Sequence, residues 1–248
     1  MSKGVVIVTG ASRGIGRACA LQAAAKGYAV VVNYTANQVA ADEVVDAIVH
    51  ASGQAIAVKG DVAEEADVLA IYAAADKLGP LVGLINNAGV VDLRARVEDF
   101  SAARLHRMMA INVIGSILCA REAVKRMSTK HGGKGGAIVN MSSAAAYLGS
   151  PNEFVDYAAS KGAIDSFTIG LAKEVAAEGI RVNAVRPGLI DTDIHASAGA
   201  PDRVVQFRSA IPMQREGSAD EVAKAVLWLL SDDASYSTGT FITVSGGR

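Results

Sequence analysis

The sequence predicts an α/β fold in a single domain spanning residues 1–248, with a doubly wound parallel sheet of seven strands and helices on both faces. Short apolar segments rich in β-branched residues alternate with longer segments of helical periodicity along the whole chain. Successive parallel strands need right-handed crossovers, which place helices on both faces of the sheet. No Pro-, Gly- or Ser-rich linker divides the chain, and 51% of its residues are hydrophobic, enough for one buried core.

The strands are expected where β-branched runs have no polar alternation, because a strand covered on both faces is apolar throughout. The first such run, Val5–Val8, is followed by a glycine-rich turn. The seven expected strands are Val5–Val8, Ala29–Asn33, Ile56–Val58, Leu84–Ile85, Ala137–Met141, Val182–Val185 and Phe241–Val244.

The helices are expected where apolar residues recur at spacings of three and four. Gly27, Gly53 and Gly179 follow three of these segments and are suited to ending a helix. The expected helical segments are Ile15–Lys26, Gln38–Ser52, Glu64–Leu78, Ser101–Met127, Val155–Glu178 and Ala219–Ser231.

Composition argues against several functional classes. The formal net charge of -1 gives no overall attraction to nucleic acid or an anionic membrane. The two cysteines, Cys19 and Cys119, lie in apolar helical segments and indicate no disulfide framework, so we expect a reducing, cytoplasmic location. The apolar run Val5–Val8 is too short for a signal peptide, and no segment approaches the roughly 20 apolar residues of a membrane span. The histidines lack metal-ligand spacing, so no metal site is expected.

A glycine-rich turn joins the first expected strand to the first expected helix. Gly10, Gly14 and Gly16 would let the backbone turn tightly and let a pyrophosphate approach the helix N-terminus, where free N–H groups favour an anion. A purely structural turn is the alternative. The position between a buried strand and a helix favours a dinucleotide site of the Rossmann type.

The end of the second strand predicts the cofactor. NAD enzymes of this kind place a carboxylate there, which accepts hydrogen bonds from the ribose 2′-OH. Here Asn33, Tyr34 and Thr35 follow one another, and no acid occurs before Asp42. These three residues can donate to a 2′-phosphate, and Arg13 in the glycine-rich turn adds a cation. We expect NADP, with NAD as a possible second cofactor.

Tyr157 and Lys161 are the candidate catalytic pair. They are four residues apart in a segment whose apolar spacing predicts a helix, so they share one face. Tyr157 would donate a proton in reduction and accept one in oxidation. Lowering a tyrosine pKa from about 10 to near neutrality requires about 4 kcal/mol, which an ammonium about 4 Å away supplies at an effective dielectric near 20. Ser142 and Ser143 follow the fifth strand, at the edge where open α/β sheets bind ligands.

Together these motifs resemble those of the short-chain dehydrogenase/reductase family, in the family's order, from Val5 to Gly246. The glycine-rich turn matches T-G-x-x-x-G-x-G, residues 86–89 match N-N-A-G, residues 112–113 match N-V, and residues 157–161 match Y-x-x-x-K. The resemblance implies that Ser143, not Ser142, orients the substrate oxygen. It implies the catalytic set Asn112, Ser143, Tyr157 and Lys161.

The resemblance also assigns contacts with the cofactor. It implies that Lys161 holds the nicotinamide ribose, that Asn112 supports a water relay, and that Asp61 and Val62 contact the adenine. The cofactor-binding residues expected from the turn, the strand ends and the resemblance are Gly10, Ser12, Arg13, Gly14, Ile15, Gly16, Asn33, Tyr34, Thr35, Asp61, Val62, Asn87, Ala88, Gly89, Tyr157, Lys161, Pro187, Gly188, Ile190 and Thr192.

The expected function is NADP(H)-dependent interconversion of an alcohol and a carbonyl in a small molecule. Reduction of 3-oxoacyl chains on a carrier protein is one alternative, although Glu178 stands where carrier-protein reductases commonly have a base. A catalytically silent dinucleotide-binding protein is another. Residues 189–212 would form the substrate lid, and His195, Met213 and Phe154 are candidates for the pocket lining.

A homotetramer with two-fold symmetry is the expected assembly. The helix Val155–Glu178 is apolar over a wide arc, which indicates burial on more than one side. Relatives pair subunits through this helix and the preceding one, and use the last strand, here Phe241–Val244, for a second contact.

Overall fold

In the computed structural model, which describes residues 2–192, 199 and 206–248, seven parallel strands form one sheet in the order β3-β2-β1-β4-β5-β6-β9. The predicted fold class is therefore confirmed. The strands of this sheet are β1 (Val5–Val8), β2 (Ala29–Tyr34), β3 (Gln54–Lys59), β4 (Leu81–Asn86), β5 (Gly136–Met141), β6 (Ile180–Pro187) and β9 (Phe241–Val244).

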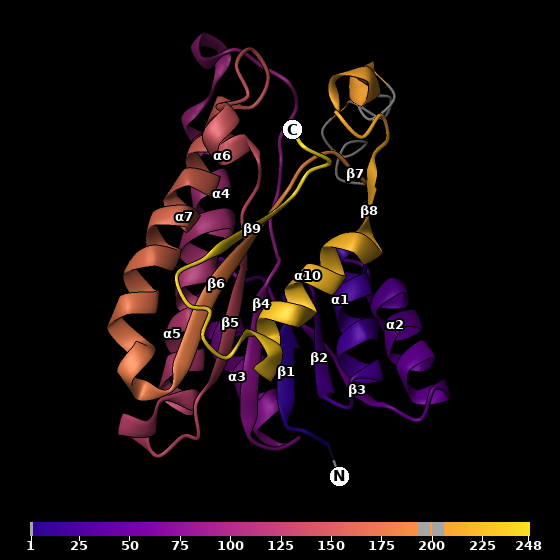
Figure 1. Cartoon of the computed structure of the whole chain (residues 1–248), viewed down its shortest axis with the longest axis vertical. Helices are drawn as coiled ribbons and strands as arrows, with labels where there is room; N and C mark the ends of the chain where they lie inside the picture. The colour runs from indigo at the N-terminus through magenta and orange to yellow at the C-terminus, as the bar shows by residue number, and fades with distance from the viewer. Residues whose placement is uncertain (1, 193–198, 200–205) are drawn as a thin grey trace.

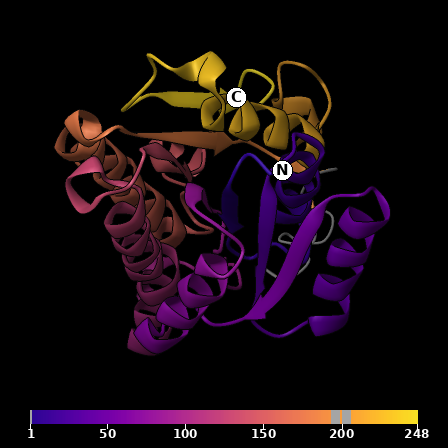
Figure 2. The ribbon, with the colours of Figure 1, turned by 90° about the horizontal axis from the view of Figure 1, so that it is seen from below.

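Helices cover both faces of the sheet (Figures 1 and 2). Because side chains alternate along a strand, Val6 and Val8 of β1 belong to one apolar core and Val5 and Ile7 to the other. The first face is covered by α1 (Gly14–Ala25), α2 (Gln38–His50) and α10 (Ala219–Leu230), and the second by α3 (Glu65–Asp76), α5 (Ser116–Met127) and α7 (Val155–Val175). The remaining helices among the described residues are α4 (Ala102–Met109) and α6 (Ala145–Leu148), with 3₁₀ turns at Val97–Asp99, Thr129–His131, Ala176–Glu178, Arg208–Ala210 and Asp232–Ala234.

The strand order reverses at β1, which lies between β2 and β4. At such a switch point the connections after the two strands leave toward opposite faces and open a crevice at the carboxyl ends. The glycine-rich turn follows β1 and residues 87–89 follow β4, so both segments border this crevice. In Figure 1 the carboxyl edge is at the top, with α6 on one side, the strands β7 (Ile190–Asp191) and β8 (Gly217–Ser218) on the other, and the C-terminus between them.

Several elements differ from the sequence-based prediction. β4 begins at Leu81, whereas the predicted strand began at Leu84. The prediction was too short because Gly83 interrupts the apolar run. A glycine is needed there for packing, since a Cβ would lie 2.8 Å from Leu230 Cδ1. The expected helix from Ser101 to Met127 is divided by a π-helical turn at Ala110–Gly115. The short parallel pair of β7 and β8 and the helix α6 were not predicted.

Candidate active site

Two adjoining cavities open at the carboxyl edge of the sheet. The first, of about 450 Å³, lies beside the glycine-rich turn, and the second, of about 560 Å³, lies beside α7. Four residues line both cavities: Ile15, Asn87, Gly89 and Thr192. The two cavities therefore form one continuous site, long enough to hold a ligand with two separate ends.

The glycine-rich turn brings backbone N–H groups to the first cavity. Gly10 and Gly14 have φ values of +60° and +53°, which disfavour a side chain. Gly16 allows a close approach, because a Cβ there would lie 2.3 Å from the Gly10 carbonyl oxygen. The first residue of α1 follows Arg13, which makes no side-chain cap, so the first-turn N–H groups remain available for an anion. These features fit a pyrophosphate.

Polar side chains hold the turn in place. Thr9 Oγ1 accepts hydrogen bonds from the backbone N–H groups of Asn87 and Ala88, both at 2.9 Å. In return, Asn87 Nδ2 donates to the carbonyl oxygens of Thr9 at 2.8 Å and Gly10 at 3.0 Å. Thr9 was not among the expected site residues, although its place at the end of a buried strand beside the glycine-rich turn is a usable signal.

Asn33 departs from the prediction. Its side chain is buried and does not line the first cavity. Its Oδ1 accepts from the Gly10 N–H at 3.2 Å, and its Nδ2 donates to the Gly60 carbonyl at 2.9 Å. The expected contact of Asn33 with a 2′-phosphate is therefore wrong for its side chain: the amide is already used to join the turn to the end of β3.

The other residues expected at the adenosine end do line the first cavity. Tyr34, Thr35 and Arg13 lie there, and so does Asp61. Asp61 is the sole carboxylate among the described lining residues, and its Oδ1 already accepts from the Ala63 N–H at 2.9 Å. The remaining cofactor candidates line one or both cavities: Gly10, Ser12, Gly14, Ile15, Gly16, Val62, Asn87, Ala88, Gly89, Pro187, Gly188, Ile190 and Thr192.

α7 brings the catalytic candidates to the second cavity. Tyr157 and Lys161 both line it, and the Lys161 Nζ lies 5.6 Å from the centroid of the Tyr157 ring. Ser143 lines the same cavity and lies beside the Tyr157 phenol. Ser142 is buried and donates instead to Asp165 Oδ1 at 2.6 Å. Both serines line the cavity, but the Ser142 hydroxyl is committed to Asp165, which leaves Ser143 as the serine beside the Tyr157 phenol.

The titration of the pair differs from the simple charge argument. Burial raises the pKa of Tyr157, and the hydrogen bond with Ser143 opposes that rise. Burial lowers the pKa of Lys161 to about 8, while the Asp165 carboxylate opposes that fall. The Lys161 ammonium donates to the Met141 carbonyl at 2.7 Å. In this state the phenol is protonated at neutral pH, as a proton donor must be.

Asn112 lies in the π-helical turn and is fully buried. Its side chain accepts from the Val90 N–H at 2.8 Å and donates to the Val90 carbonyl at 2.9 Å and Ser160 Oγ at 3.1 Å. These bonds use both ends of the amide to fix the segment after β4 against α7. π-helical turns inside helices are frequent at functional sites, but no feature of the local sequence predicted this one.

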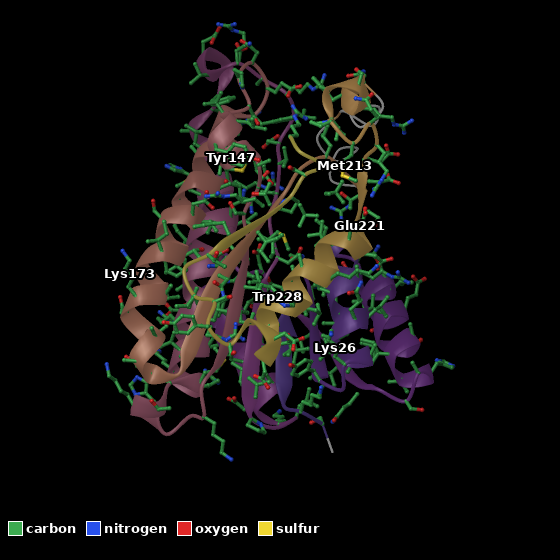
Figure 3. All side chains as sticks on the ribbon, in the orientation of Figure 1. Lys26, Tyr147, Lys173, Met213, Glu221 and Trp228 are labelled. Carbon is green, nitrogen blue, oxygen red and sulfur yellow. The ribbon has the colours of Figure 1, made fainter. Side chains whose placement is uncertain are left out.

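The outer part of the second cavity has an apolar wall. Phe154 lies there as expected, together with Leu148 and Phe207, which were not predicted. Arg248, also not predicted, adds a cation to the lining. Tyr147 Oη donates to the Arg248 carbonyl at 2.8 Å, and in Figure 3 Tyr147 lies on the side of α6 and Met213 on the side of β8. Met213 does not line this cavity. His195 and most of the expected lid, at 193–198 and 200–205, lie outside the described residues.

Within residues 2–192, 199 and 206–248, no helix has the length and apolarity needed to cross a bilayer. In the same part of the chain, no three His, Cys, Asp or Glu side chains gather as metal ligands would.

Comparison with known proteins gives the same fold and family throughout. A family model described as enoyl-(acyl carrier protein) reductase matches residues 10–248. An uncharacterised oxidoreductase of Escherichia coli, YgfF, is 56% identical over 98% of this chain and 99% of its own length. A 3-oxoacyl-[acyl-carrier-protein] reductase of Synechocystis is 41% identical over 98% of this chain and 96% of its own. A crystal structure of a dehydrogenase/reductase from Sinorhizobium meliloti superposes with a TM-score of 0.91, at 31% identity over 100% of this chain and 95% of that one. The chain is an oxidoreductase and belongs to the short-chain dehydrogenase/reductase family.

Proposed function

We propose that this protein interconverts an alcohol and a carbonyl by hydride transfer, with NADP(H) as its preferred cofactor. One observation carries the proposal: Ser143, Tyr157 and Lys161 line one cavity, and that cavity continues into the cavity of the glycine-rich turn. The bound nicotinamide supplies the hydride in reduction and receives it in oxidation.

The chain's own residues would handle the oxygen and the proton. Ser143 would donate a hydrogen bond to the substrate oxygen, where negative charge develops during reduction. Tyr157 would then transfer its phenolic proton to that oxygen, and its raised pKa keeps this proton in place before the reaction. Lys161, protonated below its pKa of about 8, would stabilise the tyrosinate that remains. In oxidation the same groups act in the reverse direction.

Preference for NADP rests on the charges around the first cavity. Tyr34 and Thr35 line it at the end of β2, where no carboxylate stands, and Arg13 lines it from the glycine-rich turn. A tyrosine hydroxyl, a threonine hydroxyl and a guanidinium can each donate to a 2′-phosphate. Asn33 does not belong to this group of donors. Of Tyr34, Thr35 and Arg13, Arg13 supplies the positive charge, and we assign it the largest share of the preference for NADP.

Reduction of 3-oxoacyl thioesters is the second candidate, and the Synechocystis relative favours it. A carrier protein is acidic and would need basic residues that are free to meet it. Two basic residues at and just after the end of α5 are already paired: Arg126 with Asp76 at 2.8 Å, and Lys130 with Glu178 at 2.6 Å. We therefore place this activity second to reduction of a free small molecule.

Assembly into a homotetramer is also proposed. Ile164 and Val175 of α7 are buried in the chain's own core, whereas Ile169 is 41% exposed. A methyl group at Gly170 would meet no described atom within 4 Å, so the chain itself does not require a glycine there. Ile169 and Gly170 therefore belong to an exposed part of α7 on which a second copy of α7 could pack. β9 is an edge strand of the sheet and could support the second contact, near Trp228, which is exposed on α10 (Figure 3).

The cysteines support a reducing compartment, and we propose the cytoplasm. Cys19 and Cys119 are free and buried, and burial raises the pKa of each thiol to about 12. Neither is available for a disulfide or as a nucleophile.

Tyr157→Phe tests the reaction. Ketones, sugars and acyl thioesters are first assayed by nicotinamide absorbance with NADPH and NADH, to find a substrate. The variant lacks the transferable proton but keeps the ring, so we expect activity to fall by about 10²- to 10⁴-fold while NADPH binding stays near wild type. Retention of more than a few per cent of activity would rule out Tyr157 as the acid/base group.

A further inference from the structure

Three polar side chains from different elements form a hydrogen-bonded unit, and one of them, Ser142, lines the second cavity. Asp165 of α7 accepts from Ser142 at the end of β5 through Oδ1, at 2.6 Å. Its other oxygen, Oδ2, accepts from Arg186 of β6 through Nη2 at 2.8 Å and Nε at 3.1 Å. Both oxygens of one carboxylate therefore have charged or hydroxyl partners.

The unit is shielded from solvent. The side chains of Arg186 and Asp165 are 23% and 14% exposed, and Ser142 is 1% exposed. The Arg186 guanidinium also packs on the ring of Phe241 in β9, 3.9 Å from its centroid. An ion pair in such surroundings is weakly screened by water and salt, so its charges act on neighbouring groups.

Each member of the unit adjoins a residue of the proposed active site in the chain. Ser142 precedes Ser143, and Arg186 precedes Pro187, which lines the second cavity. Asp165 lies one helical turn after Lys161, on the same face of α7. None of the three was a sequence-based candidate except Ser142, as the alternative to Ser143.

We propose that Asp165, held by Arg186 and Ser142, is a positioning residue that fixes the ends of β5 and β6 against α7 and keeps Lys161 protonated for the reaction. The role of Lys161 in the reaction rests on the proposed function. The effect of Asp165 on the charge of Lys161 does not depend on that function. The Asp165 carboxylate favours the ammonium form, and the Arg186 guanidinium offsets part of that effect.

The other elements packed against Lys161 supply no competing charge among the described residues. Its own helix contributes the neutral Tyr157 phenol and Asp165, and Arg186 lies behind Asp165. Met141 of β5 contributes a carbonyl oxygen, and a Cβ at Gly89 after β4 would lie 3.5 Å from Nζ. Asp165 is thus the charged neighbour that bears on the Lys161 ammonium.

Two substitutions should move the pKa of Lys161 in opposite directions. Asp165→Asn removes the carboxylate and leaves the Arg186 cation nearby, so the pKa of Lys161 should fall below about 8, by about one pH unit. Arg186→Gln removes the cation and leaves the carboxylate, so this pKa should rise. Arg186→Lys keeps the charge and should stay close to wild type. Disruption of packing alone would not produce opposite signs.

The experiment uses two readouts on the full-length protein. Competitive acetylation with acetic anhydride across pH, followed by peptide mass spectrometry, measures the pKa of Lys161 without any turnover. The pH profile of carbonyl reduction by NADPH should show the same shifts in its alkaline limb, because reduction needs the protonated lysine. Asp76→Asn, which breaks the exposed ion pair with Arg126, serves as a matched control and should leave both readouts unchanged.

Opposite shifts for Asp165→Asn and Arg186→Gln, with Arg186→Lys unchanged, support the proposal. Equal shifts, or none, in the acetylation measurement overturn it. Shifts in acetylation without matching shifts in the alkaline limb leave Asp165 in control of the Lys161 charge but show that the proposed role of Lys161 in reduction is wrong. If Asp165→Asn fails to fold, Arg186→Gln against Arg186→Lys still decides the sign.

Discussion

The two cavities use buried polar side chains in the same way but present different groups to a ligand. At the first cavity, Thr9, Asn33 and Asn87 are hydrogen-bonded to backbone, and much of the wall beside the turn is main chain. At the second, Ser142 and Asn112 play the supporting part, while Ser143 and Tyr157 keep their hydroxyls in the cavity. The first region should therefore be sensitive to added volume, and the second to the loss of a functional group.

Gly16→Ala should show the sensitivity to volume most strongly. The added methyl would lie 2.3 Å from the Gly10 carbonyl oxygen and 2.5 Å from Asn87 Nδ2, so the turn and α1 must separate. Overpacking of this kind costs about 1–3 kcal/mol, which corresponds to about 5- to 150-fold in NADPH affinity if it acts on the binding geometry. Fluorescence titration with NADPH measures the change.

The control for Gly16→Ala is Gly170→Ala, which adds the same methyl to a helix at a position where it meets no described atom within 4 Å. NADPH affinity in this control should match wild type. Wild-type affinity in Gly16→Ala would mean that the first cavity adapts to volume, and the contrast between the two regions would be lost.

Tyr34→Asp tests whether the first cavity is also sensitive to a change of functional group. The new carboxylate should repel a 2′-phosphate and accept from a 2′-OH, which shifts preference toward NADH by about tenfold or more. Since Tyr34 is 6% exposed, Thr35→Asp on the exposed neighbour provides a second variant. Tighter NADH than NADPH binding in the wild type would show that the proposed preference is wrong.

Local pattern was sufficient for elements whose environment is uniform along the chain. Val5–Val8 is apolar because both faces of β1 are covered, and periodicity located α7 from Val155 onward. Tyr157 and Lys161 were placed together because their spacing fixes one helix face. By contrast, the length of β4 was underestimated because the strand contains Gly83. This glycine makes room for Leu230, which is nearly 150 positions away in the sequence, so no local pattern could predict the contact.

The same limit explains the errors within the site. Asn33 is chemically able to bind a phosphate, and only the positions of Gly10 and Gly60 show that its amide is already used. The pair of Asp165 and Arg186 joins residues 21 positions apart on neighbouring elements. A usable signal existed for Asp165, which is a charged residue inside a segment that the apolar pattern predicts to be mostly buried, and such charges are expected to be paired. Arg186 directly follows the predicted strand Val182–Val185 and gave no such signal.

Gly170→Leu should have the smallest effect on either cavity and the largest on assembly, which tests whether the two regions depend on neighbouring subunits. The leucine has open space in its own chain, so folding and NADPH binding should stay near wild type. Across a two-fold axis, however, α7 would meet its own copy, so the interface would contain two added leucines, one from each subunit.

Light scattering at micromolar concentration should give a mass near four times 25.4 kDa for the wild type and about half of that for the variant. A wild-type mass of 25.4 kDa would defeat the assembly proposal, and an unchanged tetramer in the variant would move the contact away from this face of α7. If activity falls with the mass while NADPH affinity does not, the second cavity depends on the assembly and the first does not.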